Sequence, residues 1–254
     1  MKGENKIAII IVVFNISNLI STQIELIKYL CKDNNYDIIV IDNSHHNKSH
    51  ISEEIKNYTI NLNCLYDKVT EDLFDFSQSH AFACNYAYNK FQEHYEYMFF
   101  LDHDNFPIAN FSVKEILVDK IIGGVGQSRI TKDYFWPGCV MFNNKKISKD
   151  LIDFSINREL GLDTGGQLYQ VIDVHGKEQC VFFDQLDVKN TSFAGNTYNF
   201  YNIFTNIINA PYKFSFMHFI NASNWNNKSH NNDRINSLLK ILHGYAYEKI
   251  YERS

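Results

Sequence analysis

Apolar residues gather in short runs over the first hundred residues of the chain. The first run, 7–14, is almost continuously apolar and rich in Ile and Val, as expected for a parallel strand that is covered on both faces. Three of the runs end at polar residues, and the polar clusters begin at Asn15, Asp42 and Asp102. The strands predicted for this half of the chain are 7–14, 36–41, 64–66 and 97–101.

Amphipathic stretches separate these runs and predict helices. Residues 22–32 place their apolar side chains on one helical face, and Thr22 and Glu25 have the spacing of a capping box. A second helix, ending near Phe91, presents small residues that allow close packing on a sheet. Alternating strands and helices of these lengths predict right-handed crossovers and an α/β fold.

The second half of the chain has a less regular pattern. Its apolar runs predict strands at 121–126, 135–142, 180–183 and 214–218. Its helical patterns predict helices at 148–156, at 161–174 with Asp163 at the start, and at 233–247.

Composition indicates one catalytic-sized domain, 1–254. With 254 residues, 45% of them hydrophobic and only three prolines, the chain can bury a sizeable core and shows no linker. The net charge of −5 is spread without a basic block, which argues against a nucleic-acid partner. Five scattered cysteines lack disulfide or zinc spacing, so a reducing, cytoplasmic setting is expected.

The strongest candidate for chemistry is the triplet Asp102-His103-Asp104, which follows an apolar strand directly. In an open α/β sheet, ligands bind outside the carboxyl ends of the strands. Two carboxylates separated by one residue can hold a divalent cation there through hard oxygen ligands. The alternative is that both aspartates only end the strand in a turn.

Four stretches together carry a resemblance that no single motif would. They are Ile-Ile-Val-Val-Phe-Asn at 10–15, Ile-Val-Ile-Asp-Asn-Ser at 39–44, His-Ala-Phe-Ala-Cys-Asn at 80–85 and Met-Phe-Phe-Leu-Asp-His-Asp at 98–104. In order and spacing the chain resembles the GT-A fold glycosyltransferases of the large inverting family two. The resemblance implies a Rossmann-like mixed sheet flanked by helices. Residues 1–110 would then bind the nucleotide sugar and 111–254 the acceptor.

The resemblance also implies a donor site. Val13, Phe14 and Asn15 would line the nucleotide pocket, and Asp42 would hydrogen-bond the base or ribose, with a strand-end turn as its alternative. Asn85 would contact the donor, or else be a buried asparagine bonded to neighbouring loops.

The metal site implied by the resemblance contains Asp102, Asp104 and His218. Asp104 would bind the cation directly, and Asp102 would reach the ribose or a metal-bound water. His103 would be a spacer. His218 would complete the site, although a single histidine can equally be structural, and the loop after it would bind the diphosphate. Oxygen and imidazole ligands together suit manganese or magnesium.

On the acceptor side, Asp163 is the candidate general base, and an N-cap is its alternative role. Trp136 and Gly138 resemble the aromatic-glycine segment that receives the donor sugar and the acceptor, but an aromatic in this chain can also belong to the core. The acidic pair usual in the family is missing here. Weaker candidates for the base are Asp153, Asp173 and Asp184.

The expected activity is transfer of a sugar from a nucleotide diphosphate donor, chiefly a UDP-sugar, to a hydroxyl of a glycan or lipid-linked glycan in bacterial surface polysaccharide synthesis. Inversion is expected, and retention if no carboxylate reaches the acceptor. The rivals are a sugar-phosphate nucleotidyltransferase, whose Gly-rich basic loop is absent after residue 14, and a catalytically silent sugar-binding protein. Basic residues of the last helix permit contact with the inner face of a membrane, with packing on the domain or a second subunit as the favoured alternative.

Overall fold

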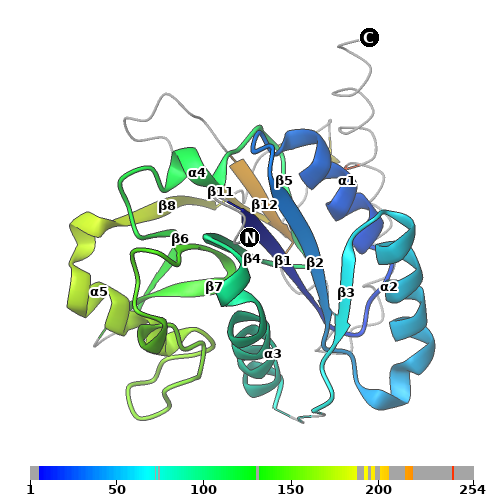
Figure 1. Ribbon diagram of the computed structural model, residues 1–254, viewed down its shortest axis with the longest axis horizontal. Helices are drawn as coiled ribbons and strands as arrows, with labels where there is room; N and C mark the ends of the chain where they lie inside the picture. The colour runs from blue at the N-terminus through cyan, green and yellow to red at the C-terminus, as the bar shows by residue number, and fades with distance from the viewer. Residues whose placement is uncertain are drawn as a thin grey trace.

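Strand β1 (Ile7–Val13) lies at the centre of the parallel part of the sheet and is buried along its whole length (Figure 1). It pairs in parallel with β2 (Tyr36–Asp42) on one side and β4 (Tyr97–Asp102) on the other, and β3 (Leu65–Lys68) extends the sheet beyond β2. The computed structural model describes residues 6–71, 73, 75–129, 132–187, 192–193, 196–197, 201–205, 215–219 and 242.

The sheet continues past β4 with mixed strand directions. In the described residues its order is β3-β2-β1-β4-β7-β6-β8-β11-β12-β5, and only the β6–β8 pairing in the second half is parallel. A separate pair joins β9 (Ser192–Phe193) to β10 (Asn196–Thr197). The remaining strands are β5 (Asn105–Pro107), β6 (Ile122–Ser128), β7 (Asp133–Asn143), β8 (Cys180–Asp187), β11 (Tyr201–Thr205) and β12 (Ser215–Phe219).

Helices cover both faces of this sheet (Figure 1). On one face pack α1 (Ile20–Leu30), α2 (Ser49–Asn61) and α4 (Val113–Ile116); on the other pack α3 (Phe76–Phe91) and α5 (Tyr169–His175). Short 3-10 segments occupy His46–Lys48, Gln92–His94, Lys149–Leu151, Gly166–Leu168 and Lys177–Gln179.

The alternating side chains of β1 hold the two faces together. Ile9 and Ile11 belong to the core under α1, whereas Ile10 belongs to the core against α3. Successive strand residues point to opposite faces, so a strand covered on both sides has to be apolar at every position. Each fully buried Ile contributes roughly 1.5–3 kcal/mol, so β1 anchors the part of the sheet that carries the acidic turn.

The α/β class and the mixed sheet flanked by helices are confirmed, and the expected strands of the first half form. Several helix predictions were wrong. Helix α1 begins at Ile20 without a side-chain cap, so Thr22 is not a capping residue. The segment 148–156 forms a single 3-10 turn, and the only α-helix within 161–174 begins at Tyr169. Except for Leu242, the helix predicted at 233–247 lies outside the described residues.

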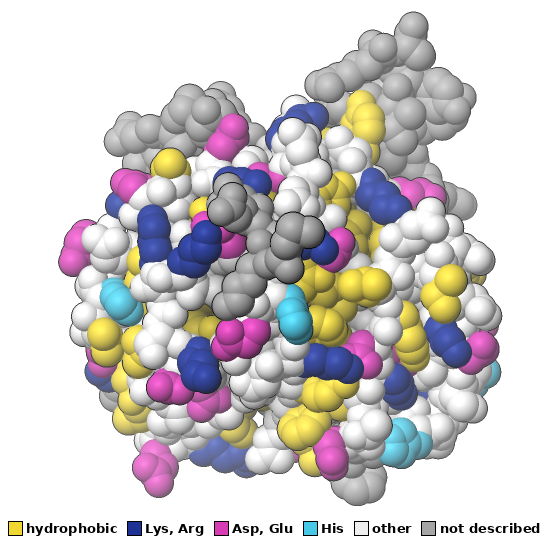
Figure 2. Space-filling view, in the orientation of Figure 1, with side chains coloured by type: hydrophobic (Ala, Val, Ile, Leu, Met, Phe, Trp, Pro, Cys, Tyr) yellow, Lys and Arg dark blue, Asp and Glu magenta, His cyan; other side chains and the backbone are white. Residues whose placement is uncertain are grey.

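Charged side chains are mixed over the surface. On the face shown in Figure 2, Lys and Arg alternate with Asp and Glu, in keeping with the absence of a basic block in the sequence. Within the described part of the chain, no helix has the length and apolar character needed to cross a membrane.

Candidate functional site

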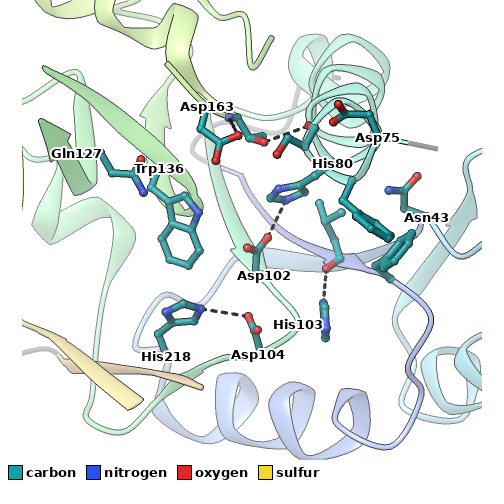
Figure 3. Close-up of a pocket in the computed structure, with 15 residues that line it drawn as sticks. Asn43, Asp75, His80, Asp102, His103, Asp104, Gln127, Trp136, Asp163 and His218 are labelled. Atoms are coloured by element: carbon teal, nitrogen blue, oxygen red, sulfur yellow. Dashed lines mark hydrogen bonds and ion pairs between the residues drawn. The ribbon is translucent and has the colours of Figure 1, made fainter. Parts of the chain in front are cut away.

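A cavity of about 540 Å³ opens at the carboxyl ends of β1, β2 and β4 (Figure 3). Because these strands are neighbours and parallel, their exits meet at one edge of the sheet. The second half of the chain closes the cavity with side chains from β6, β7, β12 and the loop before α5. The lining residues are Val12, Phe14, Asn43, Asp75, Phe76, Ser77, His80, Asp102, His103, Asp104, Gln127, Trp136, Asp163, Thr164 and His218.

The acidic turn after β4, Asp102-His103-Asp104, is held by hydrogen bonds from helix α1. Gln23 donates from Nε2 to the carbonyl oxygens of Asp102 at 2.7 Å and Asn105 at 2.6 Å. His103 is 5% exposed and lines the cavity, and its Nδ1 lies 3.2 Å from the carbonyl oxygen of Val12. A carbonyl oxygen only accepts hydrogen bonds, so this nitrogen carries a proton. The contact holds the imidazole against β1, and the role of His103 as a spacer stays a prediction.

Asp102 forms a shielded ion pair with His80 of helix α3. The Nε2 atom of His80 lies 2.8 Å from Oδ1 of Asp102 (Figure 3). Burial opposes the charged imidazole, but the carboxylate outweighs it and raises the pKa of His80 well above its usual value. Burial likewise opposes ionisation of Asp102, yet the contact with His80 lowers the pKa of Asp102. Both groups are therefore charged at neutral pH.

Asp104 faces His218 of β12 across the cavity. Their Oδ1 and Nε2 atoms are 3.6 Å apart, and the ring of Trp136 lies 4.7 Å from the imidazole between centroids. Burial lowers the pKa of His218 to about 4, so its imidazole is neutral at physiological pH. A neutral imidazole has a lone pair that a metal ion can use. The predicted approach of His218 to the acidic turn is thus observed.

The residues present fit a divalent cation that a ligand helps to hold. The described residues contain no preformed group of three or more metal-binding side chains. However, Mg²⁺ and similar ions are commonly bound by one or two carboxylates together with substrate phosphates. Asp104 supplies one carboxylate, and His218 adds an imidazole nitrogen. Among the described residues the lining contains four aspartates and no Lys or Arg, so a bound cation would favour the entry of an anionic ligand.

Asp163 lines the same cavity, on the wall away from Asp104 (Figure 3). Its Oδ1 accepts a hydrogen bond from the Thr164 amide at 2.8 Å, and the side chain is otherwise exposed. The following 3-10 turn has Gly165 as its N-cap, so the alternative role of Asp163 as a helix cap was wrong. Asp153 and Asp173 bond to other protein groups, and neither they nor Asp184 line the cavity.

The loop that carries Asp163 is attached to the start of α3. The Thr164 hydroxyl donates to the carbonyl oxygen of Ser77 at 3.0 Å, and Arg158 pairs with Asp75. Asp75 is also the N-cap of α3, since its carboxylate accepts from the Gln78 amide at 3.0 Å. These contacts fix the loop against the helix that carries His80.

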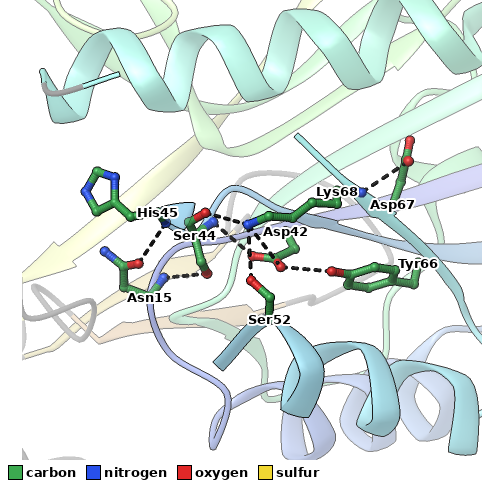
Figure 4. A network of polar contacts seen from close by, with 8 residues as sticks. All are labelled: Asn15, Asp42, Ser44, His45, Ser52, Tyr66, Asp67 and Lys68. Atoms are coloured by element: carbon green, nitrogen blue, oxygen red, sulfur yellow. Dashed lines mark hydrogen bonds and ion pairs between the residues drawn. The ribbon is translucent and has the colours of Figure 1, made fainter. Parts of the chain in front are cut away.

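Asn15 and Asp42 do not belong to the lining of the cavity. They take part in a network of polar contacts at the exits of β1 and β2 (Figure 4). The Asn15 amide donates to Ser44 Oγ at 2.9 Å, which joins the exits of β1 and β2. The Asp42 side chain is fully buried and accepts from the Ser44 amide and the Tyr66 hydroxyl, both at 2.9 Å, with Lys68 at 3.3 Å. Both of its oxygens therefore have protein partners. The next residue, Asn43, lines the cavity in its place.

Three other residues predicted at the donor site also lie outside the lining. Val13 is fully buried in the core, and Asn85 is half-buried. Asn85 bonds to Asp153 at 3.0 Å and to the Phe154 amide at 2.9 Å, which matches the loop contacts of its alternative role but not the burial expected there. At Gly138, an added Cβ would lie 2.1 Å from the Trp136 ring. This glycine makes room for Trp136, and Trp136 itself lines the cavity with Phe14.

Sequence reasoning missed the lining residues His80, Asp75 and Gln127. His80 had a detectable signal, because it precedes Cys84 by four residues on the small-residue face of a predicted helix. Such a position faces the sheet, and the start of the helix lies near the strand exits. Asp75 and Gln127 gave no comparable signal, since the place of Asp75 depends on the path of the loop before α3 and that of Gln127 on the pairing of β6 with its neighbours.

No protein-family model and no curated protein sequence matches the chain. Solved structures similar to it include the mannosyltransferase PcManGT from Pyrobaculum calidifontis in complex with GDP-Man and Mn²⁺, at 12% identity and a TM-score of 0.44, over 69% of this chain and 54% of that one. They also include an apo structure of the bifunctional glycosyltransferase WbbM, at 14% identity and a TM-score of 0.39, over 77% of this chain and 41% of that one. The chain thus spans about half or less of the length of each.

Proposed function

We propose that the protein is a metal-dependent glycosyltransferase of the GT-A type that uses a nucleotide diphosphate sugar. One observation carries the proposal: Asp102, Asp104, His218 and Asp163, from distant parts of the sequence, line a single cavity at the exits of parallel strands. Both halves of the chain contribute to this cavity. This supports a donor-binding half, 1–110, and an acceptor-binding half, 111–254, within one domain.

The donor would lie with its nucleotide against the exits of β1 and β2 and its diphosphate at the acidic turn. Phe14 and Phe76 pack edge to face with ring centroids 5.6 Å apart and offer an aromatic surface to a base. Asp104 and His218 would hold Mn²⁺ or Mg²⁺. The bound cation would neutralise charge that develops on the departing diphosphate.

Asp163 would act as the general base. Its carboxylate takes the proton of an acceptor hydroxyl while the hydroxyl oxygen attacks the anomeric carbon, and the bond from that carbon to the diphosphate oxygen breaks. Attack opposite the leaving group inverts the anomeric configuration. Trp136 would stack on the sugar or the acceptor. We further propose a UDP-sugar donor, a glycan or lipid-linked acceptor, and a cytoplasmic setting, which the five free cysteine thiols support.

A screen of nucleotide sugars tests the proposal. Each donor is incubated with the protein in Mn²⁺ or in EDTA, and the products are identified by mass spectrometry. We expect at least one donor to be hydrolysed or transferred only when the metal is present. Asp104→Asn should abolish this activity and leave the fold intact, whereas Asp119→Asn, at a position where the side chain is 72% exposed, should retain it.

Two other results would contradict the proposal. Binding of nucleotide sugars without turnover of any donor would indicate a catalytically silent binding protein. Release of pyrophosphate from a nucleoside triphosphate and a sugar phosphate would indicate a nucleotidyltransferase. Full activity of Asp104→Asn would reject the assigned cation ligand.

A further inference from the structure

His80 is the residue of helix α3 that reaches the acidic turn. Its Nε2 atom lies 2.8 Å from Oδ1 of Asp102, with the imidazole 22% exposed and the carboxylate 16% exposed. The contact is an ion pair without the geometry of an aligned hydrogen bond, and the nearby carboxylate favours the protonated imidazole. One oxygen of Asp102 is thereby already bound by the protein.

The main chain of the same aspartate is held from the opposite face of the sheet. Gln23 of α1 binds the carbonyl oxygens of Asp102 and Asn105. Helices α1 and α3 together therefore fix the backbone and one carboxylate oxygen of Asp102. Among the described residues none holds its other oxygen, Oδ2, which is therefore open to a ligand in the cavity that Asp102 lines.

Asp104 has a different environment. It contains the carboxylate that approaches His218, with 3.6 Å between Oδ1 and the imidazole nitrogen. An oxygen and an imidazole nitrogen are both ligands that Mn²⁺ accepts. The two aspartates of the turn are separated by one residue, yet Asp104 approaches His218 of β12, whereas Asp102 pairs with His80 of α3.

We propose that His80 is a positioning residue that gives the two aspartates separate roles. By holding Oδ1, it makes Asp102 a fixed hydrogen-bond acceptor for a hydroxyl of the donor's ribose, and it leaves the cation to Asp104 and His218. This inference rests on the proposed function, because it requires a nucleotide donor. His80 lies outside the acidic turn, and it would determine whether the site recognises the ribose hydroxyl of the donor.

A merely structural role for His80 would have different consequences. Tyr88 lies two helical turns further along α3 and is buried against the rings of Phe142 and Phe154. Tyr88→Leu perturbs the packing of the same helix and leaves the contact between His80 and Asp102 untouched. Tyr88→Leu is therefore the matched control for variants of His80.

The test measures binding of defined probes by calorimetry. The probes are Mn²⁺ alone, UDP or GDP with Mn²⁺, and the 2′-deoxy and 3′-deoxy forms of whichever nucleotide binds. For the wild-type protein we expect removal of one ribose hydroxyl to weaken binding about tenfold, the scale of a hydrogen bond to a charged group. His80→Leu should bind the parent nucleotide about tenfold more weakly and no longer distinguish the deoxy form.

Three controls belong to the same experiment. His80→Gln retains an N–H near the position of Nε2 and should keep most of the discrimination. Mn²⁺ alone should bind equally to the wild type and both His80 variants, but poorly to Asp104→Asn. If His80→Leu does not fold, Asp102→Asn replaces it and should likewise bind Mn²⁺ alone normally while losing the discrimination.

Several outcomes would overturn the inference. Weak Mn²⁺ binding by His80→Leu, to the extent seen with Asp104→Asn, would make Asp102 a cation ligand. Undiminished discrimination in His80→Leu, or the same loss in Tyr88→Leu, would reduce His80 to a packing residue. A wild-type protein that binds neither nucleotide with Mn²⁺ would end the proposed function and this inference together, whereas wild-type binding matched by all His80 variants would end the inference alone.

Discussion

At the scale of single residues, the site depends on which atoms of a side chain already have partners. Asp42 and Asp102 both end parallel strands, yet both carboxylate oxygens of Asp42 are bound inside the protein, whereas Asp102 has one oxygen held by His80. Sequence identifies the aspartate but not the partners, because these arrive from Tyr66 and from helix α3. The acidic turn was therefore predictable, and the burial of Asp42 was not.

Substitution of the candidate base separates catalysis from binding. Asp163→Asn should leave donor binding unchanged and reduce transfer by at least about a hundredfold, because the variant cannot accept the proton of the acceptor. Steady-state kinetics with the donor found by the screen measures this. Asp173→Asn, an exposed aspartate paired with Lys132, is the control and should keep full activity. Equal transfer rates for Asp163→Asn and wild type would contradict the assignment.

Gly138 is predicted to act through the Trp136 ring. In Gly138→Ala the new Cβ would lie 2.1 Å from that ring, so the ring must leave its place beside His218. We expect a loss of about 1–3 kcal/mol in the free energy of unfolding, measured by urea denaturation. On a Trp136→Phe background, where the clashing ring atoms are absent, the same change should cost little. Equal costs in both backgrounds would show that the ring is not the cause.

At the scale of elements, strands were easier to predict than helices. A strand buried on both faces, such as β1, shows an unbroken apolar run that few other structures produce. Helix α2 was missed because only Ile55 and Thr59 of its residues are buried, so its apolar face is narrow. The segment 161–174 contains a helical pattern, but Gly161 and Gly165 adopt positive φ angles there, which break a helix into turns.

The start of α3 gives a prediction about stability and pH. Asp75→Ala should lower the free energy of unfolding by about 1 kcal/mol, the usual effect of a lost N-cap. The hydrogen bond from the Gln78 amide, with Arg158 nearby, lowers the pKa of Asp75 below its usual value. A depressed pKa means that the ionised side chain stabilises the fold at neutral pH and that this stability is lost as the pH falls below about 3.8.

Urea denaturation of the wild type and Asp75→Ala at pH 7 and at about pH 3 checks this effect. The difference between the two proteins should shrink at the lower pH. Arg158→Ala removes only an exposed ion pair and should cost at most about 1 kcal/mol. A difference that grows on acidification would contradict the sign of the argument.

At the scale of the whole molecule, the order of strands in the sheet determines which part of the site could be predicted from the sequence. Strands β2, β1 and β4 are parallel neighbours, so their carboxyl ends meet at one edge of the sheet for any conformation of the loops. This edge of the cavity could therefore be predicted from the first 110 residues. The opposite wall depends on β7, β12 and the loop at Asp163, whose pairings span long sequence distances. Local patterns do not encode such pairings, although the resemblance placed Trp136, Asp163 and His218 near this wall.

Strand β4 pairs with β1 on one side and with β7 on the other, and this limits which sequence changes the protein can accept in evolution. A shift of one residue in β4 would move the acidic turn by about 3.3 Å and send each side chain to the other face of the sheet. Insertions and deletions within β4 should therefore be selected against, whereas the loop that follows β7, at 144–148, lies outside the lining of the cavity and can accept them. Changes in such a loop can alter the choice of acceptor, while the residues at the strand exits that would bind the donor stay the same.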